Sequence, residues 1–185
     1  MATIREGKRS VLVVVDVQVN VVREAWERAR VIGNVALAVE QARAQGAPVV
    51  WVQHEDEDMP RDSAGWQWVP ELAPREGEVR IFKRFPSSFE DTQLEAELAR
   101  LGATRIVLAG AQTNWCIRAT AYASLERGYD LTLVRDAHTT DSIDLGNGRT
   151  VAAESLVDDL NLAMTWLAYP GRKPSTAKAA ELDFA

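Results

Sequence analysis

Runs of β-branched and aliphatic residues alternate along this chain with segments of helical periodicity, and that order limits the folds it can adopt. The run SVLVVVD begins at Ser10 and ends in the carboxylate of Asp16, as buried central strands of parallel sheets do. Residues 31–42 then place apolar side chains at helical spacing, and VVWVQ follows at 49–53. This strand–helix–strand order predicts parallel pairing with a helical crossover.

The same alternation continues to about residue 167. EVRIFK, RIVLAG and DLTLVRDA read as strands, each followed by a helical segment, the last at about 151–167. Residues 54–78 are polar and without period, which predicts a long surface loop, and residues 168–185 read as a tail. We predict a single domain over 1–185, with a core at about 10–167, and a three-layer, Rossmann-like α/β fold with helices on both faces of a parallel sheet.

Length and charge narrow the class of protein. A chain of 185 residues with 46% hydrophobic content can bury one sizeable core. The net charge of −6, without a basic run, argues against nucleic acid and anionic membranes as partners. The N-terminal apolar run is too short for a membrane span or signal peptide, and a single cysteine cannot form an internal disulfide. We therefore expect a cytoplasmic protein.

Polar residues follow several of the predicted strands. In open α/β sheets, ligands bind at the carboxyl ends of the strands. Asp16, His54 and Lys83 stand there, as does the loop before Cys116. Each of these residues taken singly could be an ordinary solvated strand-end group.

Cys116, the only cysteine, lies six residues after Gly110 and in the first turn of a helix predicted to begin near Asn114. Unpaired N–H groups at a helix N-terminus stabilise a thiolate, and an ammonium such as Lys83 would lower the pKa of the thiol further. The alternative is a small buried hydrophobe, which most free cysteines are.

Three blocks together, VVVDVQ, FKRFPSSFEDTQLEAELARLG and GAQTNWCIRATAYASLERGYDLTLVRDA, resemble the isochorismatase-like cysteine hydrolases. That superfamily includes nicotinamidases, N-carbamoylsarcosine amidohydrolase and ureidoacrylate hydrolases, and the resemblance covers about residues 10–167. It implies a six-stranded parallel sheet and a catalytic triad of Asp16, Lys83 and Cys116. It also implies a non-proline cis peptide between Ala111 and Gln112, within the G-x-x-T-x-x-C motif.

These residue types suit acyl transfer. A thiolate at Cys116 attacks a carbonyl carbon, and backbone N–H groups of Gln112 and Cys116 could bind the resulting oxyanion. Asp16 can carry the proton, while Lys83 holds the charged cluster together. Further side chains that could contact substrate are Gln18, His54, Trp68, Phe89 and Trp115.

The sequence departs from the nicotinamidases of this superfamily, which carry an Asp-x-His metal stretch and a second histidine beyond it. Val52 and Gln53 precede His54 here, and the other histidine, His138, follows a different strand. We therefore expect no metal site and no cofactor, and nicotinamidase activity is disfavoured.

The reading that results is a metal-independent cysteine hydrolase that cleaves a small amide, ureide or carbamoyl C–N bond through a thioester. The alternatives are an isochorismatase-type vinyl ether hydrolase, a non-catalytic ligand-binding member of the same fold, and a receiver-like phosphoacceptor. The last explains Asp16 and Lys83 but leaves the cysteine motif unexplained. We expect a small-molecule substrate and a homodimer or higher homo-oligomer; the loop at 55–78 carries no readable code for the substrate.

Overall fold

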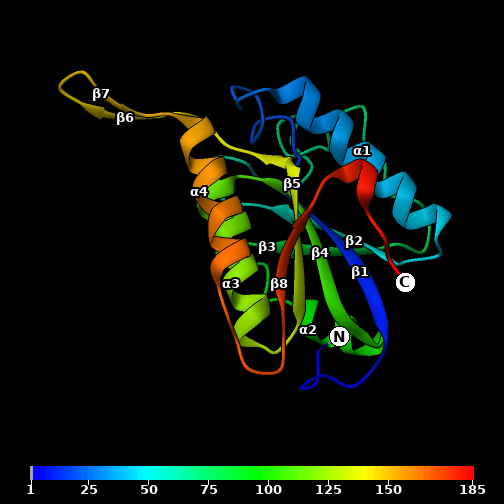
Figure 1. Ribbon diagram of the computed structural model, residues 1–185. Helices are drawn as coiled ribbons and strands as arrows, with labels where there is room; N and C mark the ends of the chain where they lie inside the picture. The colour runs from blue at the N-terminus through cyan, green and yellow to red at the C-terminus, as the bar shows by residue number, and fades with distance from the viewer. Residues whose placement is uncertain (1) are drawn as a thin grey trace.

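The computed structural model describes residues 2–185 and contains a six-stranded sheet in the order β3-β2-β1-β4-β5-β8, with every neighbouring pair parallel (Figure 1). The predicted α/β fold is confirmed. The strands are β1 (Arg9–Val15), β2 (Val49–His54), β3 (Val79–Lys83), β4 (Ala103–Ala111), β5 (Asp130–Thr139) and β8 (Pro174–Ala177).

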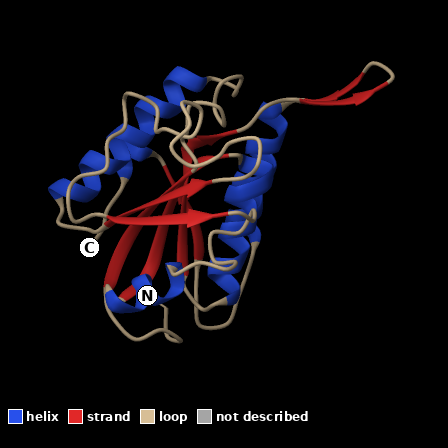
Figure 2. Ribbon diagram, turned by 180° about the vertical axis from the view of Figure 1, so that it is seen from behind, coloured by secondary structure: helices blue, strands red, loops and turns tan. Residues whose placement is uncertain are grey.

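Helices cover both faces of this sheet (Figure 2). They are α1 (Arg28–Ala44), α2 (Leu94–Arg100), α3 (Arg118–Glu126) and α4 (Ala153–Trp166), with short turns of helix at η1 (Thr113–Ile117) and η2 (Ala179–Glu181). Leu12 and Val14 of β1 pack with α1, whereas Val11, Val13 and Val15 pack with α2, α3 and α4. Because β1 is buried on both faces, its sequence is apolar without alternation.

Residues 168–185, expected as a tail, contribute the sixth strand of the sheet. β8 pairs with β5, η2 contacts α1, and Phe184 is buried in the core on the α1 face. The sequence PSTA of β8 carries no apolar run, because an edge strand needs little burial, and so the usual signal of a strand is absent.

A β-hairpin that was not predicted from the sequence projects away from the rest of the molecule (Figures 1 and 2). It consists of β6 (Ile143–Gly146) and β7 (Arg149–Val151), joined through Asn147 and Gly148, and residues 144–150 are exposed. Both turn residues have positive φ, 54° and 72°, as the tight turns of two-residue hairpins require. Asn-Gly between two short runs was the signal for it in the sequence.

The long loop between β2 and β3 folds back over the sheet. Met59, Trp66, Val69 and Leu72 are buried, so this polar segment is anchored by its few apolar side chains. No helix among residues 2–185 is long and apolar enough to cross a bilayer.

Candidate active site

Four side chains that follow different strands meet at one edge of the sheet. Asp16 directly follows β1, His54 ends β2, Lys83 ends β3, and Cys116 lies in η1 just after β4. The carboxyl ends of these parallel strands share one edge, and the chain order therefore brings together residues that are up to 100 positions apart.

Lys83 is the centre of this group, and its side chain is fully excluded from solvent. Its Nζ lies 2.6 Å from Asp16 Oδ2, 3.2 Å from Cys116 Sγ and 3.4 Å from His54 Nδ1. An ammonium has three protons, and three acceptors surround this one. Burial favours the neutral amine, but the negative charge of Asp16, together with the contact to Cys116, outweighs it and raises the pKa of Lys83.

Asp16 has an unusual backbone and an unused acceptor. Its φ is 52°, in the left-handed region, where non-glycine residues concentrate at functional sites. The residue is 1% exposed, and its Oδ1 accepts no hydrogen bond from any residue between 2 and 185. A buried carboxylate oxygen without a donor is costly, and its position beside a cavity suggests that a ligand supplies the donor.

The thiol of Cys116 differs from the expectation of a lowered pKa. Burial and the negative charge of Asp16 raise the pKa of Cys116 to about 12, and Lys83 only partly offsets them. The sequence shows the helix start and the lysine, but neither the depth of burial nor the position of the aspartate. The resting protein therefore holds a thiol, beside a carboxylate that can accept its proton.

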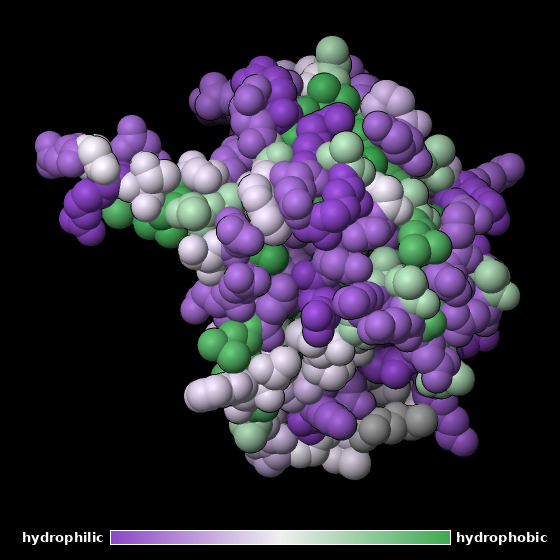
Figure 3. All heavy atoms as spheres, turned by 45° about the horizontal axis from the view of Figure 1, so that its top comes forward, coloured by the Kyte–Doolittle hydropathy of each residue, from purple (hydrophilic) through white to green (hydrophobic). Residues whose placement is uncertain are grey.

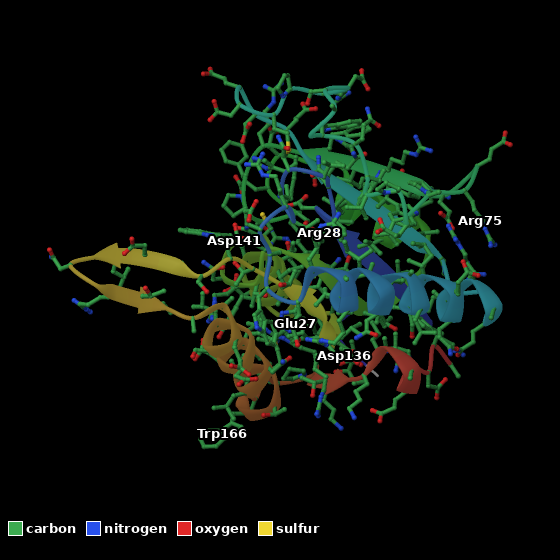
Figure 4. All side chains as sticks on the ribbon, turned by 90° about the horizontal axis from the view of Figure 1, so that it is seen from above. Glu27, Arg28, Arg75, Asp136, Asp141 and Trp166 are labelled. Atoms are coloured by element: carbon green, nitrogen blue, oxygen red, sulfur yellow. The ribbon has the colours of Figure 1, made fainter. Side chains whose placement is uncertain are left out.

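The residues before Cys116 show why its motif has this composition. Gly110 has a φ of 128°, and a Cβ at this position would lie 2.0 Å from the Val15 carbonyl oxygen, so only glycine fits between β4 and β1. The peptide bond joining Ala111 to Gln112 is cis. The Gln112 side chain donates 3.0 Å to Asp141 Oδ2, a residue labelled in Figure 4.

Thr113, the threonine of the G-x-x-T-x-x-C motif, is hydrogen-bonded to a buried histidine. Its Oγ1 lies 2.9 Å from His138 Nδ1, and His138 Nε2 lies 3.1 Å from Asn161 Oδ1. Asn161 in turn donates to the Arg135 carbonyl, which fixes its acceptor oxygen toward the ring. Burial lowers the pKa of His138 to about 4, so the ring is neutral, with its proton on Nε2.

A cavity of about 400 Å³ opens above Asp16 and Cys116. Two of the predicted substrate contacts, His54 and Trp115, line it. Several other lining residues were not predicted from the sequence: Asn20, Val21, Asp56, Asp58, Met59 and Pro86. The acidic run after His54 was visible in the sequence, but nothing in a loop without period shows which of its side chains face inward.

The other three predicted contacts lie elsewhere. Gln18 is buried, and its amide bonds to backbone groups of His54 and Trp66, so that it ties the long loop to the sheet edge. Trp68 packs edge-on against Trp51, with ring centroids 5.0 Å apart. Phe89 stacks near Tyr129 in the core. None of these three side chains lines the cavity.

No group of three His, Cys, Asp or Glu side chains between residues 2 and 185 is arranged to hold a metal ion. His54 Nε2 lies 3.0 Å from Asp56 Oδ2, and His138 is enclosed by Thr113 and Asn161. Both histidines are thus occupied by protein partners.

Comparisons with known proteins agree with this architecture. Residues 10–157 match the family model described as the isochorismatase domain. The solved structure of an isochorismatase from Pseudomonas putida KT2440 superposes with a TM-score of 0.83 at 24% identity, over 94% of this chain and 90% of that one.

Two curated relatives extend the comparison. The chain is 33% identical to a streptothricin hydrolase of Streptomyces noursei over 92% of its own length and 67% of that protein. It is 36% identical to the secreted isochorismatase effector Isc1 of Verticillium dahliae over 56% of its length, a match that spans only 57% of that relative. Sheet order, strand-end site and family match lead to one assignment: the chain belongs to the isochorismatase family of hydrolases.

Proposed function

We propose that this protein is a cysteine hydrolase that cleaves a small amide, ureide or carbamoyl C–N bond without a metal. The observation that carries the proposal is the placement of Lys83 between Asp16 and Cys116 below the cavity, with Nζ 2.6 Å and 3.2 Å from their polar atoms. A thiol, a carboxylate and a fixed ammonium at one point supply the nucleophile, the proton carrier and the charge that holds them.

The first half of the reaction forms a thioester. As the substrate carbonyl binds over Cys116, Asp16 takes the thiol proton and the sulfur attacks the carbonyl carbon. The N–H groups of Gln112 and Cys116 bind the oxygen, which becomes negative in the tetrahedral intermediate. Asp16 then gives its proton to the departing nitrogen, the C–N bond breaks, and an acyl group remains on sulfur.

The second half releases the acid. Asp16, again ionised, takes a proton from a water molecule, whose oxygen attacks the thioester carbon. The C–S bond breaks, and Asp16 returns its proton to the thiolate. The raised pKa of Cys116 favours this return, because the resting state is the neutral thiol.

A reducing compartment such as the cytoplasm would keep the single thiol free. We also propose that the protein works as a homodimer or higher homo-oligomer on a small-molecule substrate. The exposed hairpin of β6 and β7 supports the oligomer, and the cavity of about 400 Å³ supports a small-molecule substrate.

The test is ammonia release from a panel of small amides, ureides and carbamoyl compounds, with a vinyl ether as a further substrate. Cys116→Ala should abolish C–N cleavage while the circular dichroism spectrum stays that of the wild type. Intact-mass spectrometry on acid-quenched turnover should find the acyl adduct on Cys116. C–N cleavage that persists in Cys116→Ala contradicts the proposal, and vinyl ether cleavage that persists there favours the ether hydrolase instead.

A further inference from the structure

The mouth of the cavity is acidic. The charged side chains that line it are the carboxylates of Asp16, Asp56 and Asp58 together with His54, and no lysine or arginine is among the described lining residues. Lys83 already neutralises Asp16 from below. Asp56 and Asp58 therefore set the charge that a substrate meets. The molecular surface seen in Figure 3 is mostly hydrophilic.

Among residues 2–185, no lysine or arginine forms an ion pair with either of these carboxylates. Burial alone would raise the pKa of Asp56, but hydrogen bonds from the Met59 N–H, at 2.7 Å, and from His54, at 3.0 Å, hold it below its usual range. Asp58 is exposed, and its carboxylate forms no hydrogen bond or ion pair with the described residues.

The nearest arginines are engaged by a different carboxylate. Arg61 Nε lies 2.7 Å from Glu55 Oε2, and Arg84 Nε lies 3.4 Å from Glu55 Oε1. Neither guanidinium group forms an ion pair with Asp56 or Asp58, although both line a neighbouring hollow together with Asp56. The four carboxylates of residues 55–58 outnumber these two arginines, so the loop at the mouth remains net negative.

Two further features of the cavity point to a ligand with N–H groups and positive charge. The indole of Trp115, next to Cys116 in the chain, lines the cavity and is 58% exposed, which leaves an aromatic face for a cation. The Oδ1 atom of Asp16, buried at the cavity, has no hydrogen-bond donor among residues 2–185. Carboxylates beside an open indole are the surroundings that ammonium and guanidinium groups prefer.

We propose that the substrate of this site is a cationic amide: an ammonium or guanidinium group binds between Asp56, Asp58 and Trp115, while the reacting carbonyl lies over Cys116. Only the placement of the reacting carbonyl over Cys116 rests on the proposed function. The preference for a cation exists whether or not the carbonyl is cleaved. Substrates that carry a carboxylate in place of the cation are repelled by the same two aspartates.

The first experiment measures selection by charge without requiring hydrolysis. Cys116 is the only cysteine, so its modification by methanethiosulfonate reagents can be followed by intact mass. Each rate is divided by the rate of the same reagent with free 2-mercaptoethanol, because a thiolate in solution already favours the cationic reagent. We expect the normalised rate of the trimethylammonium-ethyl reagent to exceed that of the sulfonatoethyl reagent about tenfold at low salt, with the ratio falling as salt is added. Equal normalised rates for the two reagents overturn the proposal.

Variants assign the selection to residues. Asp58→Asn and Asp56→Asn should each reduce the ratio of the two rates severalfold. Glu126→Gln is the matched control, because it removes one charge from an exposed residue at the end of α3 and should leave the ratio unchanged. A ratio that drops as much in Glu126→Gln as in Asp58→Asn would mean that net charge alone produces the effect, and the proposal fails.

The second experiment uses three amides of equal length: 6-aminohexanamide, heptanamide and adipic acid monoamide. We expect kcat/KM to be highest for the cationic amide, lower for the neutral amide and lowest for the anionic amide. In Asp58→Asn, the cationic amide should lose its advantage over the neutral one. Turnover of all three at equal kcat/KM overturns the cation proposal and leaves the hydrolase proposal intact. A persistent preference in thiol modification without turnover or acylation by any amide supports the acidic mouth and counts against the proposed hydrolysis.

Discussion

Lys83 Nζ and Asp16 Oδ2 form an ion pair at 2.6 Å with both side chains excluded from water. Each of these buried charges stabilises the other, and removing one leaves the other without a counter-charge. Cys116 Sγ lies on the same ammonium at 3.2 Å. The protonation of the sulfur therefore depends on which charge of the pair is present, and this dependence can be measured.

Asp16→Asn should affect reactivity and turnover in opposite directions. The substitution removes a negative charge that raises the pKa of Cys116 and leaves Lys83 beside the sulfur. The thiol pKa should fall, and iodoacetamide should label Cys116 faster at neutral pH than in the wild type. Turnover should drop by roughly 10²–10⁴-fold, because the proton carrier is gone. Slower labelling in Asp16→Asn would mean that the carboxylate also assists alkylation, contrary to this reasoning.

Lys83→Met should raise the thiol pKa further and destabilise the fold. Without the ammonium, Asp16 is buried with an uncompensated charge, a loss of about 3–5 kcal/mol in unfolding free energy. Urea denaturation measures this loss, and labelling against pH measures the thiol. In the double variant with Asp16→Asn, much of the stability should return, because no charge is left unpaired. Simple addition of the two single losses would show that the pair is not coupled.

The strand-end residues could be predicted from the sequence because the buried strands consist almost entirely of apolar residues. β1, β2 and β4 are continuous apolar runs, so their ends are visible, and parallel strands must bring Asp16, Lys83 and Cys116 to one edge. The position of Asp58 could not be predicted in this way. It depends on how Met59 and Trp66 anchor a loop whose sequence has no period.

The protonation state of Cys116 also could not be predicted from the sequence. A helix start and a lysine near Cys116 predict a lowered thiol pKa, and both are present, but burial and Asp16 act more strongly. Electrostatic balance among close charges depends on distances of a few ångströms and on exclusion of water. Gln18 illustrates the same limit: its place after β1 suggested a substrate contact, yet its amide is fully engaged by backbone groups.

Chelators should leave activity unchanged. Within residues 2–185 no three metal-ligating side chains converge, and His54 and His138 have protein partners. The rate of C–N cleavage is measured before and after incubation with EDTA and gel filtration. Recovery of lost activity on adding zinc would contradict it, whereas calcium bound by the exposed acidic run near Asp58 should not alter the rate.

The β6–β7 hairpin should be part of a subunit interface. Residues 144–150 are exposed, Leu145 to 51%, and a two-stranded hairpin without a covering layer is marginally stable in water. We expect the protein to sediment as a dimer or larger, and Leu145→Asp to weaken the association. A wild-type species of 20.4 kDa at micromolar concentration would contradict the expectation. Glu154→Gln, on an exposed position of α4, serves as the control.

His138 should make the fold sensitive to mild acid. Its folded pKa is about 4, below the ordinary value of 6.5, so the unfolded chain binds a proton first as pH falls. The stability it contributes is complete above about pH 6.5 and lost as pH falls toward 4, by about 3 kcal/mol. Urea midpoints should therefore fall more steeply from pH 7 to 4 in the wild type than in His138→Asn. The variant is less stable at pH 7, but it has no imidazole at position 138 that takes up a proton on unfolding. Parallel slopes would mean that carboxylates alone cause the acid sensitivity.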